Sequence, residues 1–389
     1  MRVKKVHDEA GRIHYELLDD DDRPVPEAAG FLRFLEARGC SPNTLSAYAH
    51  DLLHFYRFLG QEGLDCESFT SQASLRFLEY LRTVPSTKRV QRLSPTLVST
   101  DADGRPFARL SAATVNRAFA AVSSFYEYLI VSGLLAEPEN PLTKTEDPER
   151  ARVPERHKPF VGRVSRHKPV RGVTRVKTVR RVPRPMSEEQ IERFFAGLKH
   201  LRDRAVFLLM LQGGLRPGEI LNLKLEDVQY GSRRVVVRHR EDHPKGARTK
   251  SRTERLVDLQ EAGALEGLSA YVMEERPKDA ESAFVFLVGG NGKRRCEPLG
   301  YSALVRLFAR TCERAGIREP WVTPHSLRHT HATRMWEGGM RELALQKRLG
   351  HASPESTRTY TRVSDEAVLE EYRRALGERR EDAPEEANS

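Results

Sequence analysis

Hydrophobic residues recur every three or four positions along most of residues 26–133, a spacing that predicts amphipathic helices. Ser41 is a good N-cap for the second of these helices, and Pro42 suits its first turn. Gly39 is placed to end the helix before it. The pattern predicts four helices that pack as one small domain, within residues 26–39, 41–60, 71–84 and 112–133.

The residues around these helices follow other patterns. Residues 2–6 and 12–18 are predicted to pair as a hairpin, with a turn at residues 8–11. Residues 85–110, between the third and fourth helices, have no clear periodicity and predict a mobile surface loop.

A second domain begins after a change in pattern near Ser187, a predicted N-cap followed by acidic residues. Residues 201–215 are mostly apolar and predict a buried helix. Residues 233–240 and 253–260 are predicted strands joined by a polar loop, and helices dominate from Ser302 onward.

These patterns predict a fold that is mainly α with a small β-sheet, in the α+β class. The length of 389 residues is typical of two domains. The expected organisation is an N-terminal extension at 1–24, a helical domain at 25–145, a basic linker at 146–185, a second domain at 186–377 and a disordered polar tail at 378–389.

Positive charge is concentrated in the linker. The chain has a net charge of +10, whereas Arg150–Arg184 alone contains thirteen basic residues and one acid, a net charge of +12. Prolines and scattered valines in this segment break any helical period, so we expect it to be extended. A solvated spacer is one interpretation. We favour a linker that contacts DNA, because phosphates would relieve its self-repulsion.

Other classes of protein are disfavoured by what the sequence lacks. No apolar run approaches the roughly 18 residues of a membrane span, and the N-terminus has no apolar segment of a secretory signal. The four cysteines have neither metal-binding nor disulfide spacing. We therefore expect a cytoplasmic protein with no membrane partner.

Polar residues of the second domain fall at predicted element boundaries. Pro324 can open a helix that places His325 and Arg328, three residues apart, on one face. Gly350 can end the next helix and turn His351 outward. The same domain supplies three more candidates, namely Arg216, Lys250 and Tyr360.

These residue types together suit phosphoryl transfer. Arg216 and Arg328 can bind the oxygens of one phosphodiester and neutralise charge that grows in the transition state. Guanidinium groups nearby would make the Tyr360 phenolate a workable nucleophile. Lys250 can protonate a departing oxygen, and histidines can donate to the phosphate or move a proton. Nothing resembles an oxygen-rich magnesium site, so we expect no metal or cofactor.

The order Arg, Lys, His-x-x-Arg, Gly-His, Tyr resembles the tyrosine recombinase (phage integrase) family, in its Xer/integrase-like branch. The carrying segments are "GLRPGEIL", "KSRTERLVDL", "HSLRHTHAT" and "LGHASPESTRTYT". In the first domain, "SPNTLSAYAHDLLHFYRFL" and "SAATVNRAFAAVSSFYEYL" look like the family's helical, SAM-like core-binding domain. The resemblance covers roughly residues 25–375, and it implies that residues 186–377 form the catalytic domain.

The resemblance implies a role for each matching residue. Arg216 and Arg328 would bind the scissile phosphate. Glu219 could pair with Arg216 without contacting the phosphate itself. Lys250 would be the general acid. Lys224 and Lys245 lie near it in the sequence, and Lys250 is preferred because it stands at the start of the second predicted strand.

The remaining carried-over roles concern the nucleophile. Tyr360 would attack the phosphate and leave a 3′-phosphotyrosyl bond with a free 5′-hydroxyl. His325 would assist proton transfer and His351 would hydrogen-bond the phosphate. His329 and His331 are expected to be structural. Bond energy is conserved in such a reaction, so no ATP is required.

The implied partner is double-stranded DNA with specific recombination sites, held in a C-clamp. The protein would act as a tetramer on DNA, with possible accessory DNA-bending or directionality factors. A short helix at residues 364–377 could dock in cis or on a neighbouring protomer. The candidate DNA contacts are Arg117, Arg163, Arg166, Lys168, Arg171, Arg175, Lys177, Arg180 and Arg181.

Two alternatives stay open from the sequence. A type IB topoisomerase-like enzyme uses similar residues to relax DNA, and a DNA-binding protein could have lost catalysis. The helical first domain disfavours the former, and the presence of every motif disfavours the latter. Integration, excision, transposition and resolution are not distinguished.

Overall fold

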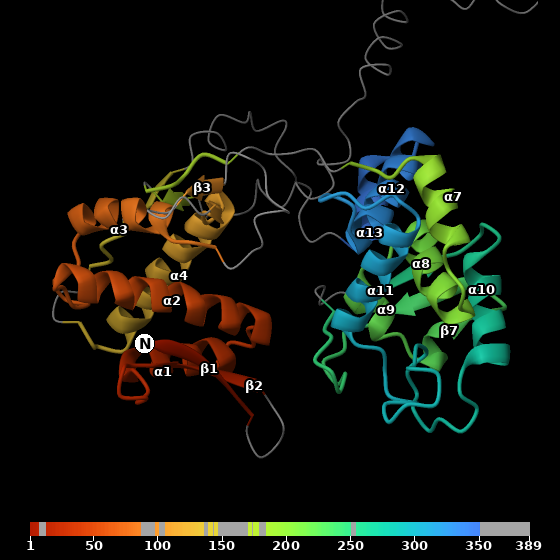
Figure 1. Cartoon of the computed structure of the whole chain (residues 1–389), viewed down its shortest axis with the longest axis horizontal. Coiled ribbons are helices and arrows are strands. Elements are labelled where there is room, and N and C mark those ends of the chain that lie inside the picture. The colour runs from red at the N-terminus through yellow and green to blue at the C-terminus, as the bar shows by residue number, and fades with distance from the viewer. Residues whose placement is uncertain are drawn as a thin grey trace, which may run out of the picture. The chain divides into compact units, whose positions relative to one another are not determined.

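The structure is a computed structural model that describes residues 1–7, 13–86, 98–100, 106–135, 139–142, 144–146, 170–172, 174–178, 184–249 and 254–350. The chain divides into two compact units, Met1–Arg180 and Arg181–Ser389 (Figure 1). No helix in the described part of the chain is both long and apolar enough to cross a membrane.

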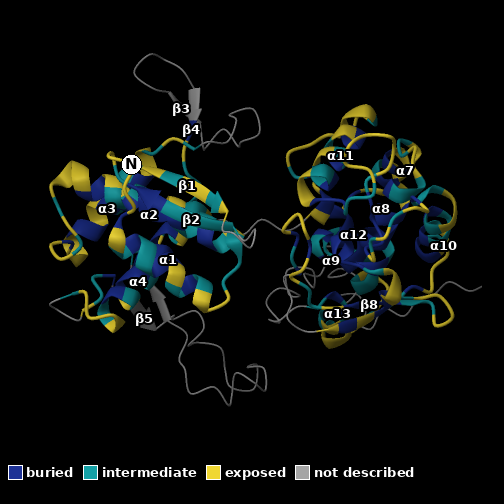
Figure 2. Cartoon of the chain, turned by 90° about the horizontal axis from the view of Figure 1, so that it is seen from below, coloured by how far each residue is buried: buried dark blue, intermediate teal, exposed yellow. Residues whose placement is uncertain are grey.

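Helices form most of the described first unit, and the four predicted by periodicity are confirmed. They are α1 (Pro26–Ala37), α2 (Pro42–Glu62), α3 (Ser71–Thr83) and α4 (Ala112–Val131). The Ser41 hydroxyl caps α2 by accepting from the Thr44 backbone N–H at 3.2 Å. The inward faces of the helices are buried (Figure 2). Aromatic rings fill this core, among them Phe31, Phe55, Phe77 and Phe125.

The predicted N-terminal hairpin is confirmed as β1 (Arg2–His7) paired antiparallel with β2 (Ile13–Leu18). Its predicted turn at residues 8–11 lies outside the described residues. Leu17 and Leu18 are buried, and Leu17 joins the core of the helical unit. The N-terminal extension therefore packs on the helices.

The prediction of an irregular loop at residues 85–110 is wrong for two short stretches. Val98–Thr100 (β3) pairs antiparallel with Pro106–Ala108 (β4). The β-branched residues Val98 and Thr100 suit a strand. Three-residue strands are too short to show the alternation on which the prediction relied.

Part of the linker forms a strand, which is extended as predicted, but the pairing of this strand was not predicted. Lys144–Glu146 (β5) pairs antiparallel with Val170–Gly172 (β6). Beyond β6, the Asn116 side chain donates to the Val176 carbonyl at 3.0 Å and accepts from its N–H at 2.9 Å. An asparagine amide offers one donor and one acceptor side by side, so it binds an extended backbone as a strand would. This contact fastens part of the linker to α4.

The second unit is built around α8 (Leu201–Gly213), which is buried along most of its length (Figure 2). The predicted N-cap at Ser187 is confirmed, and Gln190 completes a capping box with it that was not predicted. Its described helices are α7 (Glu188–Ala196), α8 (Leu201–Gly213), α9 (Pro217–Leu221), the 3-10 turn η4 (Leu225–Asp227), α10 (Ala264–Ala270), the π-helix η5 (Tyr271–Glu275), α11 (Tyr301–Arg314), α12 (Pro324–Glu337) and α13 (Glu342–Leu349).

A small antiparallel sheet completes the second unit. Its strands are β7 (Val228–Gln229), β8 (Arg234–Val237) and β9 (Arg255–Asp258), in that order. The two predicted strands are confirmed as β8 and β9, with Val235 opposite Val257. The short strand β7 was not predicted. Both β9 and α12 carry residues of the site described next.

Candidate active site

Arg216 stands at the junction between two helices of the second unit. Helix α8 ends at Gly214, whose φ of 63° is in the left-handed region, and Arg216 is the N-cap of α9. Gly214 has no room for a Cβ, because that atom would meet the His331 ring. The Arg216 backbone N–H and its Nη1 each donate to the Glu219 carboxylate at 2.8 Å. The arginine is thus oriented by its own helix.

Glu219 is the centre of the site. Its side chain is fully buried, and Arg255 Nη1 and Nη2 donate to its two oxygens, each at 2.8 Å. Arg328 Nη1 lies 4.0 Å from the carboxylate. Burial alone would raise the pKa of Glu219, but Arg255, Arg216 and Arg328 together outweigh it and lower the pKa to about 2. The carboxylate is therefore ionised at neutral pH.

Arg328 approaches from α12. It is buried, with 3% of its surface exposed. It donates to the carbonyl of Gly214 and, at 2.7 Å, to the carbonyl of Leu349. His325, one turn earlier on the same helix, is exposed. The predicted helix start at Pro324 is confirmed. At this end of the helix, the Thr323 N–H donates to the Ser326 hydroxyl at 3.1 Å.

Three arginines, Arg216, Arg255 and Arg328, form what we call the arginine cluster. They donate to three consecutive carbonyls at the end of α13. Helix C-termini leave carbonyls without internal partners and carry partial negative charge, so cations are favoured there. The bonds are Arg255 Nε to the Arg348 oxygen at 2.9 Å, Arg328 Nη2 to the Leu349 oxygen at 2.7 Å and Arg216 Nη2 to the Gly350 oxygen at 3.0 Å.

Three sequence-predicted residues, Lys250, His351 and Tyr360, lie outside the described residues. The described residues that precede His351 are held against the site. Gly350 ends α13 with φ of 61°, as predicted, and directly precedes His351.

The segment leading to Lys250 is fastened to α9. Asn222 Nδ2 donates to the Ala247 carbonyl at 3.1 Å. Gly218 faces the Arg248 carbonyl so closely that a Cβ would collide with it. The alternative lysines are engaged in ion pairs, Lys224 with Asp242 at 2.7 Å and Lys245 with Glu297 at 2.8 Å.

His331 is a buried neighbour of the arginine cluster. Its Nδ1–H donates to the Leu211 carbonyl at 2.9 Å, and its Nε2 accepts from Arg348 Nε at 3.0 Å. Burial first, then the charge of Arg348, lowers the pKa of His331 to about 3. For His329, burial first and then the charges of His325 and Arg328 lower the pKa to about 4. Within the described residues, no group of His, Cys, Asp and Glu could hold a metal ion.

The buried, neutral His331 predicts a loss of stability in mild acid. The unfolded chain takes up a proton near pH 6.5, and the folded chain does so only near pH 3. The contribution of His331 is therefore complete above pH 6.5 and is lost as pH falls below it. Between pH 6.5 and 5 the loss is about 2 kcal/mol.

Urea unfolding of the second unit at several pH values measures this loss. The pH dependence should shrink by about that amount in His331→Gln. His200→Gln, a histidine whose side chain is 65% exposed, is the surface control. If the free energy of unfolding changed with pH equally in His331→Gln and in the unaltered protein, a buried neutral His331 would be contradicted.

The candidate DNA contacts are only partly described. The Arg117 side chain is 44% exposed, and its Nε and Nη2 donate to the buried Asp51 carboxylate at 2.8 and 2.9 Å. Arg175 and Lys177 are exposed on either side of Val176. Arg171 lies in β6. The others, Arg163, Arg166, Lys168, Arg180 and Arg181, lie outside the described residues.

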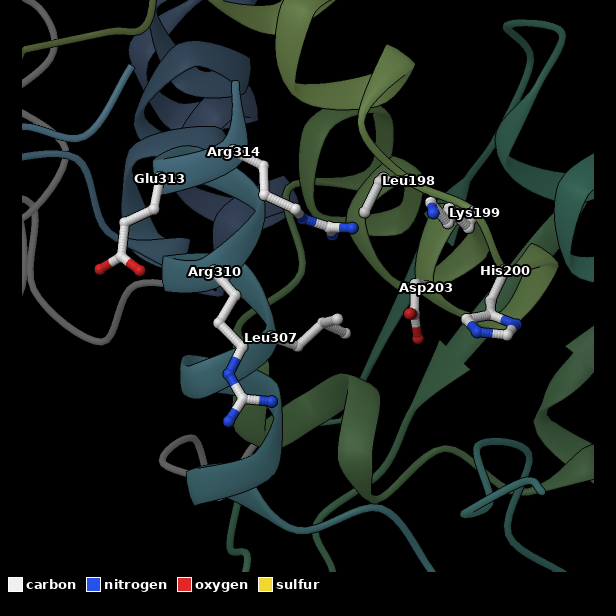
Figure 3. A pocket seen from close by; sticks show the side chains of 8 residues that line it. All are labelled: Leu198, Lys199, His200, Asp203, Leu307, Arg310, Glu313 and Arg314. Carbon is white, nitrogen blue, oxygen red and sulfur yellow. The ribbon is translucent and has the colours of Figure 1, made fainter. Parts of the chain in front are cut away.

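A separate pocket of about 430 Å³ lies beside α11 (Figure 3). Arg310, Glu313 and Arg314 of α11 line one side, facing Lys199 and Asp203 from the start of α8 and the segment before it. Of the described candidate catalytic residues, Arg216, His325 and Arg328, none lines it. The arginine cluster is therefore not part of this pocket.

Sequence reasoning missed Arg255 and Arg348. The sequence held a signal for Arg255, because it shares a strand face with the apolar Val257 and Leu259. In the structure the arginine is buried while Leu256, the next residue, is 53% exposed. Successive strand residues face opposite sides, so a charge on the buried side beside an exposed leucine indicates a buried partner. That partner is Glu219.

Comparisons with known proteins agree with this architecture. The model of the phage integrase family matches residues 184–367, and that of the phage integrase N-terminal SAM-like domain matches residues 28–133. Transposase A from transposon Tn554 of Staphylococcus aureus is 29% identical over 371 residues, covering 94% of this chain and 95% of the relative. Tyrosine recombinase XerC of Pelobacter propionicus is 28% identical, covering 90% of this chain and 94% of the relative.

Solved structures share the fold. The Tn1549 transposon integrase in complex with transposon right end DNA has a TM-score of 0.57 at 17% identity, covering 90% of this chain and 99% of that one. The XerH recombinase bound to a palindromic difH substrate has a TM-score of 0.57 at 18% identity, covering 92% and 90%. The two matched domains and the order of the site residues agree, and the chain belongs to the phage integrase family of tyrosine recombinases.

Proposed function

We propose that this protein is a site-specific DNA recombinase that cuts and rejoins DNA strands through a 3′-phosphotyrosyl intermediate. One observation carries the proposal. Arg216 and Arg328, from different helices, donate to adjacent carbonyls at the end of α13, directly before His351. The residues suited to bind a phosphate therefore surround the point from which the chain continues toward Tyr360.

In this proposal Arg216 and Arg328 neutralise the scissile phosphate, where charge accumulates in the pentacovalent transition state. Both are guanidinium groups, which bind phosphate oxygens in a fixed planar fork. Glu219 holds Arg216 in place and is not in contact with DNA. Its ionised carboxylate keeps the cluster from carrying three uncompensated positive charges, since the site would otherwise repel itself.

The proposed chemistry balances without an external energy source. The Tyr360 oxygen attacks phosphorus, the bond to the 5′ oxygen breaks, and Lys250 supplies the proton that the departing oxygen takes up. His351 donates to a phosphate oxygen, while His325 helps to remove the tyrosine proton. The free 5′-hydroxyl of another strand then attacks the phosphotyrosyl bond, which reverses the first step and rejoins the DNA.

The proposed partner is duplex DNA carrying recombination sites, and the proposed active form is a tetramer. Its relatives include a transposase and Xer recombinases, and two of its structural neighbours are bound to DNA. The match of residues 28–133 to the SAM-like N-terminal domain favours a recombinase over a topoisomerase-like enzyme.

Covalent capture tests the function although the recognised site is not known. The protein is incubated with a duplex library made from genomic fragments carrying random single-strand nicks, so that a cleaved strand loses its short 5′-hydroxyl fragment and cannot be rejoined. Denaturation, removal of unbound DNA and sequencing then identify trapped strands. We expect enrichment of one sequence, linked through its 3′-phosphate. Binding without any adduct would contradict an enzymatic role.

The basic linker predicts a measurable salt dependence. Replacing the arginines and lysines from Arg163 to Arg184 by Ser or Gln should weaken binding to all duplexes and flatten the slope of log affinity against log salt. Each lost phosphate contact reduces that slope by about 0.9. A matched control neutralises surface arginines held in ion pairs, Arg233 with Glu266 and Arg295 with Asp279. An unchanged slope in the linker variant would show that the linker is a spacer.

A further inference from the structure

Arg255 connects two parts of the site that are distant in the sequence. Its side chain is 6% exposed. Nη1 and Nη2 bind the two oxygens of Glu219 on α9, while Nε binds the Arg348 carbonyl at the end of α13. One guanidinium therefore joins the helix that begins beside Arg216 to the helix end that precedes His351.

Gly350 shows how closely this connection is packed. Its φ of 61° lies in the left-handed region, which glycine adopts without strain. A Cβ at this position would lie 2.8 Å from Arg255 Nη1 and 3.1 Å from its Cζ. The backbone thus turns away from α13 directly against the guanidinium plane. The place where the chain leaves toward His351 is set by contact with Arg255.

We propose that Arg255 is a positioning residue for strand cleavage. It holds Arg216 in place through Glu219, and it holds the end of α13, from which the chain continues toward Tyr360. The role rests on the proposed recombinase function. Arg255 is not a catalytic residue in this account, because all three of its hydrogen-bonding nitrogens are bound to protein groups. It acts by holding the Glu219 carboxylate and the end of α13 in fixed positions relative to each other.

The fork geometry explains why this position carries arginine. A carboxylate and a carbonyl must be bound at once, which needs three donors in one plane, and a guanidinium has that arrangement. A lysine ammonium could bind either group but has no planar fork to hold both. Arg255→Lys should therefore keep a positive charge next to Glu219 and still lose the alignment.

Glu219 gives a readout that a purely structural role would not change. The charged groups that lower its pKa are Arg255 from β9, Arg216 at the start of α9 and Arg328 from α12, with Arg255 first among them. Arg348 of α13 faces Arg255 through its carbonyl. Without Arg255, burial raises the pKa of Glu219, so the carboxyl takes up a proton at a higher pH and then holds Arg216 less well. In the Arg255 variants, cleavage should therefore begin to fall at a higher pH than in the unaltered protein.

The experiment uses the full chain and the nicked duplex recovered by covalent capture. Arg255→Gln and Arg255→Lys are compared with Arg234→Gln, a control on the neighbouring strand whose arginine is 36% exposed and pairs with Asp258. Single-turnover cleavage is measured from pH 5 to 8, together with DNA affinity. We expect cleavage to fall about 100-fold in Arg255→Gln, as for a misplaced group, with affinity within threefold. The acid decline should begin at a higher pH than in the control.

A second variant keeps the test decisive if Arg255→Gln folds poorly. Arg255→Lys keeps a positive charge beside Glu219 and serves where Arg255→Gln folds poorly. In the double variant Arg255→Gln/Glu219→Gln no carboxyl remains at position 219 to take up a proton, so the acid decline that Arg255→Gln adds should disappear. Equal cleavage in the Arg255 variants and the control would overturn the positioning role alone. A cleavage loss with an unchanged pH profile would also overturn it. Failure of the unaltered protein to form any adduct would instead contradict the proposed function.

Discussion

Tyr360→Phe is expected to abolish the covalent protein–DNA adduct while leaving DNA binding intact. The change removes one oxygen, which is the proposed nucleophile, and keeps the ring, so the surrounding fold should be preserved. Trapping on the nicked duplex, followed by denaturing electrophoresis, measures the adduct. Binding is measured in parallel by mobility shift.

Tyr301→Phe is the matched control, because Tyr301 is a tyrosine of the same unit with 48% of its surface exposed. This variant should form the adduct at the normal rate. Digestion of the trapped complex should leave the nucleotide on the peptide that contains Tyr360. An adduct formed by Tyr360→Phe, or one mapped to Tyr372, would refute the assignment.

Glu219→Ala is expected to destabilise the second unit more than any change of a surface residue. It leaves the buried Arg255 and Arg328 and the half-buried Arg216 without a counter-charge, and breaking a buried ion pair from one side costs about 3–5 kcal/mol. For a unit of this size, each kcal/mol shifts the melting temperature by about 2–4 °C. Calorimetry should show the transition of the second unit lowered by roughly 6–20 °C, with the first unit unchanged.

The pH dependence of this stabilisation has a definite sign. The folded pKa of Glu219, about 2, lies below its ordinary value of 4.5. The contribution is therefore present above pH 4.5 and is lost as pH falls toward 2. Glu226→Ala is the control, since that carboxylate is 67% exposed and pairs with Arg240 at the surface. A melting temperature of Glu219→Ala equal to that of the control would contradict the central role of Glu219.

Local chemistry explains which parts of the fold could be predicted. The α2 and α7 starts follow from serine caps, and the end of α13 follows from Gly350, because each depends on a few neighbouring residues. The strand β7 and the pair β3–β4 were missed because two or three residues carry too little periodicity. The π-helix at Tyr271–Glu275 was missed because its hydrogen-bond shift has no sequence pattern of its own.

The residues of the candidate site also fall into those that the sequence predicts and those that only the folded chain brings together. Arg216, His325 and Arg328 could be chosen because their motifs are contiguous. The partner of Arg255 could not be chosen from the sequence, because Glu219 lies 36 residues away and only the folded unit brings the two together. Lys250, His351 and Tyr360 remain predictions from the sequence, because they lie outside the described residues.

The long sequence separations within the arginine cluster have a consequence for protein synthesis. Arg216 binds the carbonyl of Gly350, 134 residues later, and Arg328 binds that of Gly214, 114 residues earlier. A chain still growing on the ribosome can therefore complete this cluster only after residue 350 has emerged, when nearly the whole second unit is free to fold. The helical unit and the basic linker, which carry the proposed DNA contacts, precede it, so in the proposed function a nascent chain meets DNA before it can cut it. Premature release by a stop codon before residue 350 would yield a fragment that lacks both the complete cluster and the proposed nucleophile.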